Sequence, residues 1–243
     1  MSSSALPPAS SSPSQTLDFG RCFTFITEDP DWLKKVLIGG LFTLASFLIV
    51  GLFFVAGYWS RFLRAVAAGQ PRPLPEWDDL GGIFSDGLRV VGLYFVCWIG
   101  AFALFVLLAC PIGLAAGGLA SVSRSDGARE ALSALGGLGV FLIYGVFILL
   151  SFALSLVFPA AAARVVLKED LSAGLDVRAV LFFVRSNLGN YLLSLVVMIL
   201  AHFLAQFGFI LCCVGLFPAT FWAYLTLGYA IGETVRLNPA SIG

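Results

Sequence analysis

Four long uncharged stretches constrain this chain more than any other feature of its sequence. They run from Val36 to Ser60, from Val90 to Ser123, from Ala131 to Ala163 and from Ser186 to Gly232. A helix needs about 20 apolar residues to cross the hydrocarbon core of a bilayer, and each stretch exceeds that length. Because lipid offers no water to satisfy unpaired backbone groups, we expect all four stretches to be helical.

The composition argues against an ordinary water-soluble domain. Charged residues make up 12% of the chain and hydrophobic residues 59%, whereas soluble domains carry about 25% charged residues. We therefore predict an all-α integral membrane protein that passes through the cell membrane several times. The net charge is zero, which gives no reason to expect a nucleic-acid partner.

The two ends of the chain differ from its middle. Residues 1–16 are rich in Ser, Pro and Ala and contain too few apolar residues to pack, so a disordered tail is predicted there. Residues 17–236 are predicted to form a single helical membrane domain, followed by a short C-terminal tail at 237–243.

The stretch "EWDDLGGIFSDGLR", residues 76–89, holds the most compact acidic patch of the chain. Apolar residues recur in it at spacings of three and four, on one face of a helix: Trp77, Leu80, Phe84 and Leu88. After Pro75, Asp78 and Asp79 would occupy the first turn, where the helix dipole favours negative charge. We predict an amphipathic helix at the membrane surface, with Trp77, Asp78, Asp79 and Asp86 as its interfacial motif. The two neighbouring aspartates would point about 100° apart, so a metal site is not expected.

The basic residues discriminate between two topologies for residues 36–60. As one straight span, this stretch would place nine of the fourteen basic residues on the cytoplasmic side. As a hairpin bent near Ser46–Gly51, it would place twelve there and leave only Arg124 and Arg129 outside. Since Lys and Arg accumulate in cytoplasmic loops, the hairpin is favoured, with both termini in the cytoplasm. Each half is short for a full span, so a re-entrant hairpin stays open as an alternative.

The chain then divides into three units, each an interfacial amphipathic helix followed by a membrane hairpin. The amphipathic segments are Leu17–Lys35, Glu76–Arg89 and Leu175–Tyr191. The six transmembrane or re-entrant helices are predicted at Trp32–Phe47, Leu48–Ala67, Val90–Ala115, Leu132–Phe158, Tyr191–Ile210 and Cys212–Thr234.

Residues that could carry chemistry are sparse at membrane depth. His202 and Gln206, four residues apart, share one face of the fifth predicted helix and form a candidate intramembrane polar pair. A proton relay needs a chain of ionisable groups, and no acid accompanies this pair in its span. The simpler interpretation is a hydrogen bond between helices. The five cysteines show no ligand-like spacing with the single histidine, so neither a metal nor another cofactor is expected.

Three parts of the chain resemble a known family. They are "DFGRCFTFITEDPDWLKKVLIGGL", "GYWSRFLRAVAAGQPRPLPEWDDLGGIFSDGL" and, near the C-terminus, "FWAYLTLGYAIGETVR". They resemble the multi-pass prokaryotic membrane family catalogued as domain of unknown function 4013, over about Leu17 to Arg236. This family has no established activity, so the resemblance implies a multi-pass membrane protein and no catalytic residues.

Three classes of function fit the sequence to different degrees. The first is a non-enzymatic accessory, scaffold or binding protein, whose partners are membrane lipids, another membrane protein or a second copy of the chain. The second is a small transporter or lipid-translocating protein that uses His202 and Gln206. An intramembrane enzyme ranks last, because no serine or cysteine has a plausible base partner. We therefore expect no enzymatic activity.

Overall fold

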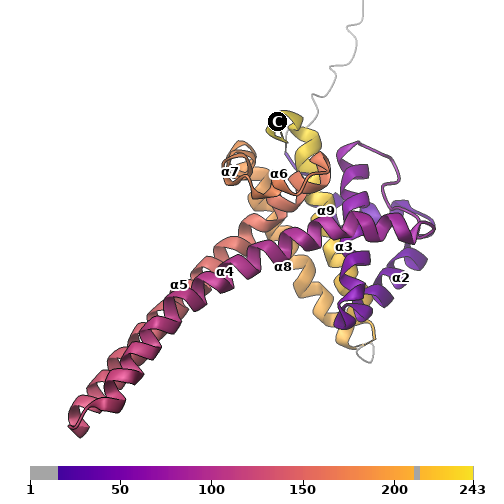
Figure 1. The fold of residues 1–243 in the computed structure, drawn as a ribbon. Helices are drawn as coiled ribbons and strands as arrows, with labels where there is room; N and C mark the ends of the chain where they lie inside the picture. The colour runs from indigo at the N-terminus through magenta and orange to yellow at the C-terminus, as the bar shows by residue number, and fades with distance from the viewer. Residues whose placement is uncertain (1–15, 211–213, 243) are drawn as a thin grey trace, which may run out of the picture.

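The computed structural model describes residues 16–210 and 214–242, and all regular structure in these ranges is helical (Figure 1). The predicted disordered tail lies outside the described residues, apart from Thr16. Three helical segments are long and apolar enough to cross a membrane: Leu80–Val122, Asp126–Lys168 and Leu188–Ile210. The helical class is confirmed, and these three segments are consistent with a membrane protein.

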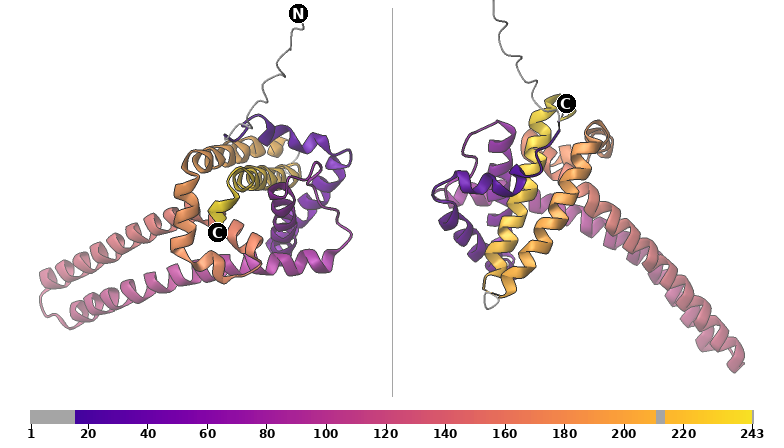
Figure 2. Two further views of the ribbon diagram at one scale, coloured as in Figure 1. Left: turned by 90° about the horizontal axis from the view of Figure 1, so that it is seen from above. Right: turned by 180° about the vertical axis from the view of Figure 1, so that it is seen from behind.

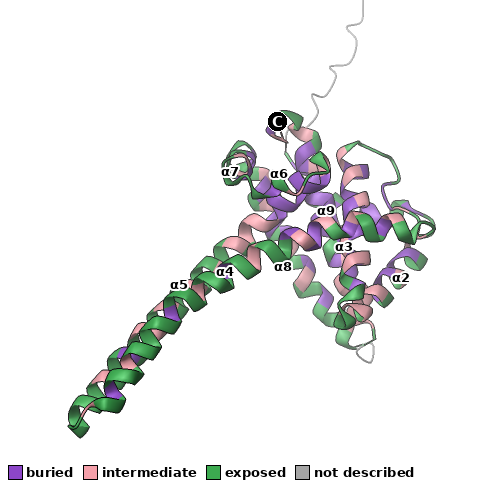
Figure 3. Cartoon of the chain, viewed as in Figure 1, coloured by how far each residue is buried: buried purple, intermediate pink, exposed green. Residues whose placement is uncertain are grey.

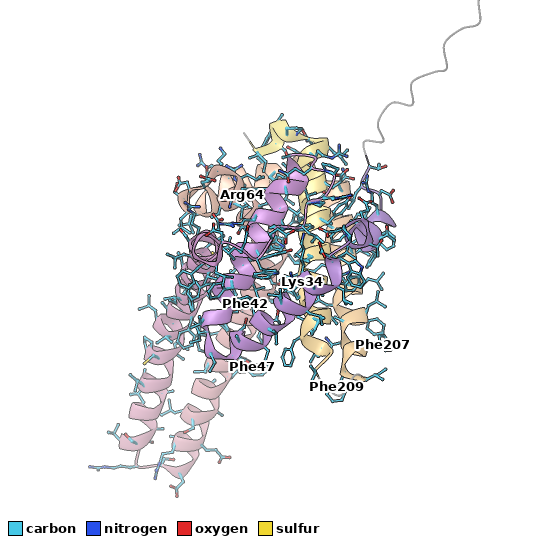
Figure 4. The ribbon with its side chains drawn as sticks, turned by 90° about the vertical axis from the view of Figure 1, so that its right-hand side faces the viewer. Lys34, Phe42, Phe47, Arg64, Phe207 and Phe209 are labelled. Atoms are coloured by element: carbon cyan, nitrogen blue, oxygen red, sulfur yellow. The ribbon has the colours of Figure 1, made fainter. Side chains whose placement is uncertain are left out.

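The first apolar stretch folds as two helices joined by a tight turn. Helix α2 spans Trp32–Ala45, the 3-10 turn η2 spans Ser46–Leu48, and helix α3 spans Val50–Ala67. A Cβ on Gly51 would lie 2.1 Å from the carbonyl oxygen of Phe42, so glycine permits the close approach of the two helices. Figure 4 shows Phe47 at one end of this pair, and Lys34 and Arg64 towards the other. The structure therefore has the bend that the distribution of basic residues favoured.

Helices α4 and α5 are much longer than predicted. They span Leu80–Val122 and Asp126–Lys168, 43 residues each. At 1.5 Å per residue each is ~65 Å long, about twice the ~30 Å thickness of a bilayer's hydrocarbon core. They run antiparallel and leave the rest of the molecule obliquely as one long hairpin (Figures 1 and 2).

The predicted ends of these two helices, at Ala115 and Phe158, are wrong. Both ends were placed close to a proline, yet Pro111 and Pro159 lie inside continuous helices. Proline is tolerated within membrane helices, because neighbouring groups can satisfy the backbone atoms that it frees.

The three predicted interfacial segments do not form equivalent units. The first forms two single turns, α1 (Arg21–Thr24) and η1 (Phe25–Glu28), with Cys22, Phe25 and Ile26 buried. The second is not a separate surface helix, because α4 continues through Arg89 into the apolar stretch without a helix-ending residue. The third gives a helix of its own, α7 (Val177–Ser186), after the single turn α6 (Ser172–Leu175).

Helices α8 (Leu188–Gln206) and α9 (Leu216–Leu237) pack side by side, and α9 also packs against α2 and α3. Two 3-10 turns complete the fold, η3 (Phe207–Ile210) after α8 and η4 (Pro239–Ile242) at the C-terminal end. The helix start predicted at Cys212 falls outside the described residues, and the described part of α9 begins four residues later.

The buried side chains concentrate in one part of the molecule, which we call the body: α1–α3, α6–α9 and the ends of α4 and α5 that contact them (Figure 3). Its largest buried side chains include Tyr58, Phe62 and Leu63 of α3 and Phe221 and Leu225 of α9. The rest of the long hairpin, residues 100–153, is called the distal hairpin and is mostly exposed.

Candidate functional site

The acidic stretch that precedes and begins α4 is held by basic side chains of α3. Arg61 donates through Nε to Asp86 Oδ2 at 2.8 Å and through Nη2 to Asp79 Oδ2 at 2.7 Å. Arg64 lies 2.7 Å from the other oxygen of Asp86. The second oxygen of Asp79 accepts from the backbone N–H of Gly82 at 2.9 Å and so caps the start of α4.

These ion pairs connect three helices in one network. Arg64 of α3 bonds both Asp86 of α4 and Glu169, the residue after α5, the latter at 2.7 Å. The hydrogen bonds that Asp79 accepts, above all from Arg61, hold the pKa of its carboxyl below the ordinary value. The acidic stretch therefore fastens α4 to α3 instead of only facing water, and Arg64 extends the network to the end of α5.

A second ion-pair group lies at the start of α2. Lys35 is 4% exposed, and its Nζ lies 2.8 Å from Asp29 Oδ2 and 2.6 Å from Glu76 Oε1. It also donates to the carbonyl of Leu74 at 3.1 Å. Burial raises the pKa of Asp29, but the hydrogen bonds from Lys35 and from the Asp31 N–H outweigh it and leave the pKa lowered. A buried ammonium is tolerated here because all three partners compensate its lost hydration.

Trp77 lies in an aromatic stack. Its ring centroid is 4.3 Å from that of Tyr58 and 4.9 Å from that of Phe42, both in stacked orientation. Its indole N–H donates to the backbone carbonyl of Lys35 at 3.1 Å. The residue therefore joins the segment before α4 to both α2 and α3.

The structure splits the predicted interfacial motif. Asp79 and Asp86 pair with Arg61 of α3 and Trp77 stacks on Tyr58, whereas Asp78 is exposed and forms no ion pair in the described part of the chain. The prediction that this helix starts directly after Pro75 is wrong, because α4 begins at Leu80, with Asp79 as its N-cap. The physical reason is that Lys35 and the Tyr58 hydroxyl draw the carbonyls of residues 74 and 75 into tertiary hydrogen bonds.

The basic partners Lys35, Arg61 and Arg64 were missed from the sequence. One signal could have identified two of them, since Arg61 and Arg64 are three residues apart, on one face of the predicted helix that precedes the acidic stretch. Nothing local to Lys35 indicates that it would be buried.

A cavity of about 640 Å³ lies where the α4–α5 hairpin leaves the body. Its wall is built from α2, η2, α3, α4, α5, α8 and α9 and is mainly apolar, with Trp59, Phe158 and Met198 among its members. Among the described residues, no Asp, Glu, Lys or Arg lines it. Its volume is within the range of small-molecule sites, about 300–1,000 Å³.

His202 lines this cavity, and Gln206 does not. The exposed side chain of Gln206 donates only to the backbone carbonyl of His202, at 3.4 Å, so the two side chains do not form a polar pair with each other. The Nδ1 atom of His202 lies 2.9 Å from the Met198 carbonyl. Because a carbonyl only accepts, Nδ1 is the donor in this bond, and in the corresponding neutral tautomer Nε2 is an acceptor.

The ring that accompanies His202 belongs to α9. Tyr224 also lines the cavity, and the two ring centroids are 5.4 Å apart in an edge-to-face arrangement. The sequence could not single out this tyrosine, since it lies on a different helix in a stretch rich in aromatic residues.

Metal-ligating residues do not gather in the described part of the chain: residues 16–210 and 214–242 contain no group of three His, Cys, Asp or Glu that could hold a metal ion. Cys22 is buried in the body, where burial raises the pKa of its thiol to about 12. Cys97 is half-buried and Cys110 is exposed.

A family described as "Protein of unknown function (DUF4013)" matches residues 40–214, which is more than half of the chain. This chain belongs to the DUF4013 family. The match confirms the resemblance over a shorter range than residues 17–236. It includes α3, the acidic stretch, the long hairpin and α8, whereas Lys35 and Tyr224 of this DUF4013 protein lie outside it. Comparisons with curated proteins and with solved structures found no match.

Proposed function

We propose that this DUF4013 protein is a non-enzymatic membrane protein that binds an apolar, lipid-like molecule in the cavity of the body at the base of the long hairpin. The observation that carries the proposal is the cavity itself, about 640 Å³ in volume and lined without an acidic or basic side chain other than His202. Such a lining suits a ligand with a large apolar body, because a charged ligand would lose its hydration without gaining a counter-ion.

The sequence positions of the lining residues support a ligand drawn from the membrane. Every one of them falls within the four uncharged stretches at 36–60, 90–123, 131–163 and 186–232. These stretches are the parts of the chain that are suited to hydrocarbon. The cavity would therefore exchange its contents with lipid more readily than with water.

The exposed apolar turns at one end of the body also support a position of this region within the hydrocarbon of a membrane. Phe47 and Leu48 in the α2–α3 turn are 79% and 77% exposed, and Phe209 and Ile210 after α8 are 62% and 76% exposed. Figure 4 shows Phe47, Phe207 and Phe209 towards the same end of the molecule, away from Arg64. Such side chains are favourable in hydrocarbon and costly in water. In our proposal α2 and α3 form a re-entrant hairpin, and both termini are cytoplasmic.

Native mass spectrometry of protein extracted gently from its own membrane tests this function. The wild type is expected to retain one class of lipid-like molecule. The Ser155→Phe variant, which places a ring in the cavity wall, is expected to lose it. Ala153→Phe is the matched control, because this exposed residue of the same helix does not line the cavity.

Two results would contradict lipid binding. One is a wild-type protein that carries no small molecule, and the other is retention of the same molecule by Ser155→Phe. A protein partner at fixed stoichiometry, with an empty cavity, would favour the accessory or scaffold role instead.

Lipid translocation is a second candidate, and one observation favours it. Pro159 lies in the cavity wall and inside α5, where the missing backbone hydrogen bond gives the helix a place to bend. Translocation requires that wild-type protein in liposomes speeds the exchange of a fluorescent lipid between leaflets and that Ser155→Phe does not. Equal rates of lipid exchange with and without the protein would exclude translocation and leave lipid binding as the proposed function.

A further inference from the structure

We infer that the ligand of this cavity carries a hydroxyl group bound between His202 and Tyr224, which makes it a long-chain alcohol or phenol and not a charged lipid. This inference rests on the proposed function and adds the chemistry of the ligand's polar group.

His202 leaves one hydrogen-bonding atom for a ligand. Its Nδ1–H donates to the Met198 carbonyl, so the Nε2 lone pair is the acceptor that remains. No hydrogen bond to Nε2 exists among residues 16–210 and 214–242. Nε2 is accessible, since it is not among the fully buried polar atoms that lack a partner in the described residues, and a ligand hydroxyl that reaches it would add a hydrogen bond.

Tyr224 supplies the complementary group beside it. Its backbone carbonyl accepts from the indole N–H of Trp59 at 3.1 Å, which ties α9 to α3 at the level of the cavity. Its hydroxyl has no hydrogen-bond partner in the described part of the chain. A phenol donates as well as accepts, so this group can donate to a ligand oxygen while His202 accepts from it.

The combination selects a particular class of ligand. An acceptor nitrogen and a donor hydroxyl, on two rings of the wall whose centroids are 5.4 Å apart, match an atom that both donates and accepts, which a hydroxyl oxygen does and an ether or ester oxygen does not. A carboxylate or phosphate would bring a charge into a wall that holds no Lys or Arg.

Three of the other hydroxyls of the wall compete poorly for this role, whereas the hydroxyl of Tyr94 in α4 has no hydrogen-bond partner among the described residues and can add a second donor. Thr43, Ser46 and Ser155 each donate to a backbone carbonyl three or four residues earlier in the chain, at 2.8, 3.0 and 2.7 Å. Thr220 lies one turn before Tyr224 on the same face of α9, so it adds to the same polar spot.

The test compares two probes that share an apolar body, farnesol and farnesyl methyl ether, titrated into delipidated protein in detergent. Trp59 lines the cavity and provides a fluorescence signal. The wild type is expected to bind the alcohol about threefold to tenfold more tightly than the ether, as one additional hydrogen bond would give.

Substitutions at the polar spot sharpen the comparison. His202→Phe and Tyr224→Phe are expected to reduce the preference for farnesol to less than about twofold and to leave ether binding near the wild-type value. Tyr144→Phe is the matched control, since this half-exposed tyrosine of α5 does not line the cavity. Gln206→Leu is also expected to keep the full preference, because its side chain lies outside the cavity wall.

The outcomes separate this inference from the proposed function. Equal wild-type affinity for both probes, with loss of both in Ser155→Phe, would overturn the hydroxyl inference and leave the lipid cavity in place. An undiminished preference in His202→Phe would also overturn it. Binding of neither probe to the wild type would overturn the hydroxyl inference and count against the cavity as a lipid site.

Discussion

The body and the distal hairpin use apolar residues in opposite ways. In the body, Tyr58, Phe62 and Leu63 of α3 are completely buried. In the distal hairpin, Leu107 and Leu142 are 69% and 60% exposed (Figure 3). Both regions contain long stretches that are uncharged and apolar in sequence. Apolar character in such a chain therefore indicates membrane depth, and it does not tell whether protein or lipid covers a side chain.

Glycines show the same difference at the level of the backbone. A Cβ on Gly57 of α3 would lie 1.7 Å from the Ile83 carbonyl oxygen, and one on Gly87 of α4 would lie 1.8 Å from that of Phe53. In the distal hairpin, nothing lies within 4 Å of a Cβ built on Gly100 or Gly137. Gly57 and Gly87 let two helices of the body touch, whereas Gly100 and Gly137 of the hairpin face open space and only Gly136, against Ala116, approaches a neighbouring helix so closely among the distal-hairpin glycines.

The largest effect is expected for a side chain placed at the α3–α4 crossing. Gly57→Leu should destabilise the protein by about 3 kcal/mol or more, because the two backbones must separate. Gly100→Leu should change the stability by less than about 1 kcal/mol. Thermal unfolding of the two purified variants in detergent measures the difference. Equal losses would show that body and hairpin are packed alike.

A smaller effect is expected for the buried ion pair at the start of α2. Asp29→Asn should cost about 1–3 kcal/mol at neutral pH, since Lys35 loses a charged partner. The pKa of Asp29 is lowered in the folded protein. Its contribution to stability is therefore present above the ordinary aspartate value of about 3.9, and it is lost as the pH falls through the lowered folded value.

The midpoint of unfolding, measured from neutral to acidic pH, checks this assignment. Wild-type stability should fall more steeply below about pH 4 than that of Asp29→Asn. Asp126→Asn is the control, because this aspartate is exposed at the tip of the hairpin and should change neither stability nor pH dependence. Parallel curves for the wild type and Asp29→Asn would exclude the ion pair as a source of acid sensitivity.

The smallest expected effect on stability is that of removing a serine hydroxyl. This effect should have opposite signs in the hairpin and in the body. Ser151 Oγ is buried in the hairpin without a hydrogen-bond partner among the described residues, so Ser151→Ala should stabilise the protein by up to about 1 kcal/mol. Ser194 in the body is fully buried and donates to the Asn190 carbonyl at 2.8 Å, so Ser194→Ala should cost about 1 kcal/mol. Thermal unfolding of both variants measures the two changes. A loss of stability in both would contradict the expected difference between the unpaired hydroxyl in the hairpin and the paired one in the body.

Local patterns predicted the elements of the fold better than their roles. The distribution of basic residues favoured a break in residues 36–60, and the chain turns there at Ser46–Leu48. The same logic assigned Asp79 and Asp86 to a water-facing helix surface. The structure instead pairs both with Arg61, which is 18 and 25 residues away. Hydropathy predicts how deep in the membrane a residue lies, but it carries no information about which charged side chains form ion pairs with each other.

The sequence by itself determined that this chain is helical and has stretches suited to a membrane, because hydropathy and backbone hydrogen bonding are properties of each segment alone. Only the tertiary structure decided which apolar faces are buried, that Tyr224 lies beside His202, and that the hairpin leaves the body at a cavity. Those features depend on contacts between helices distant in the chain. Close approach at Gly57 and charge pairing at Arg61 set such contacts, and neither follows from hydropathy.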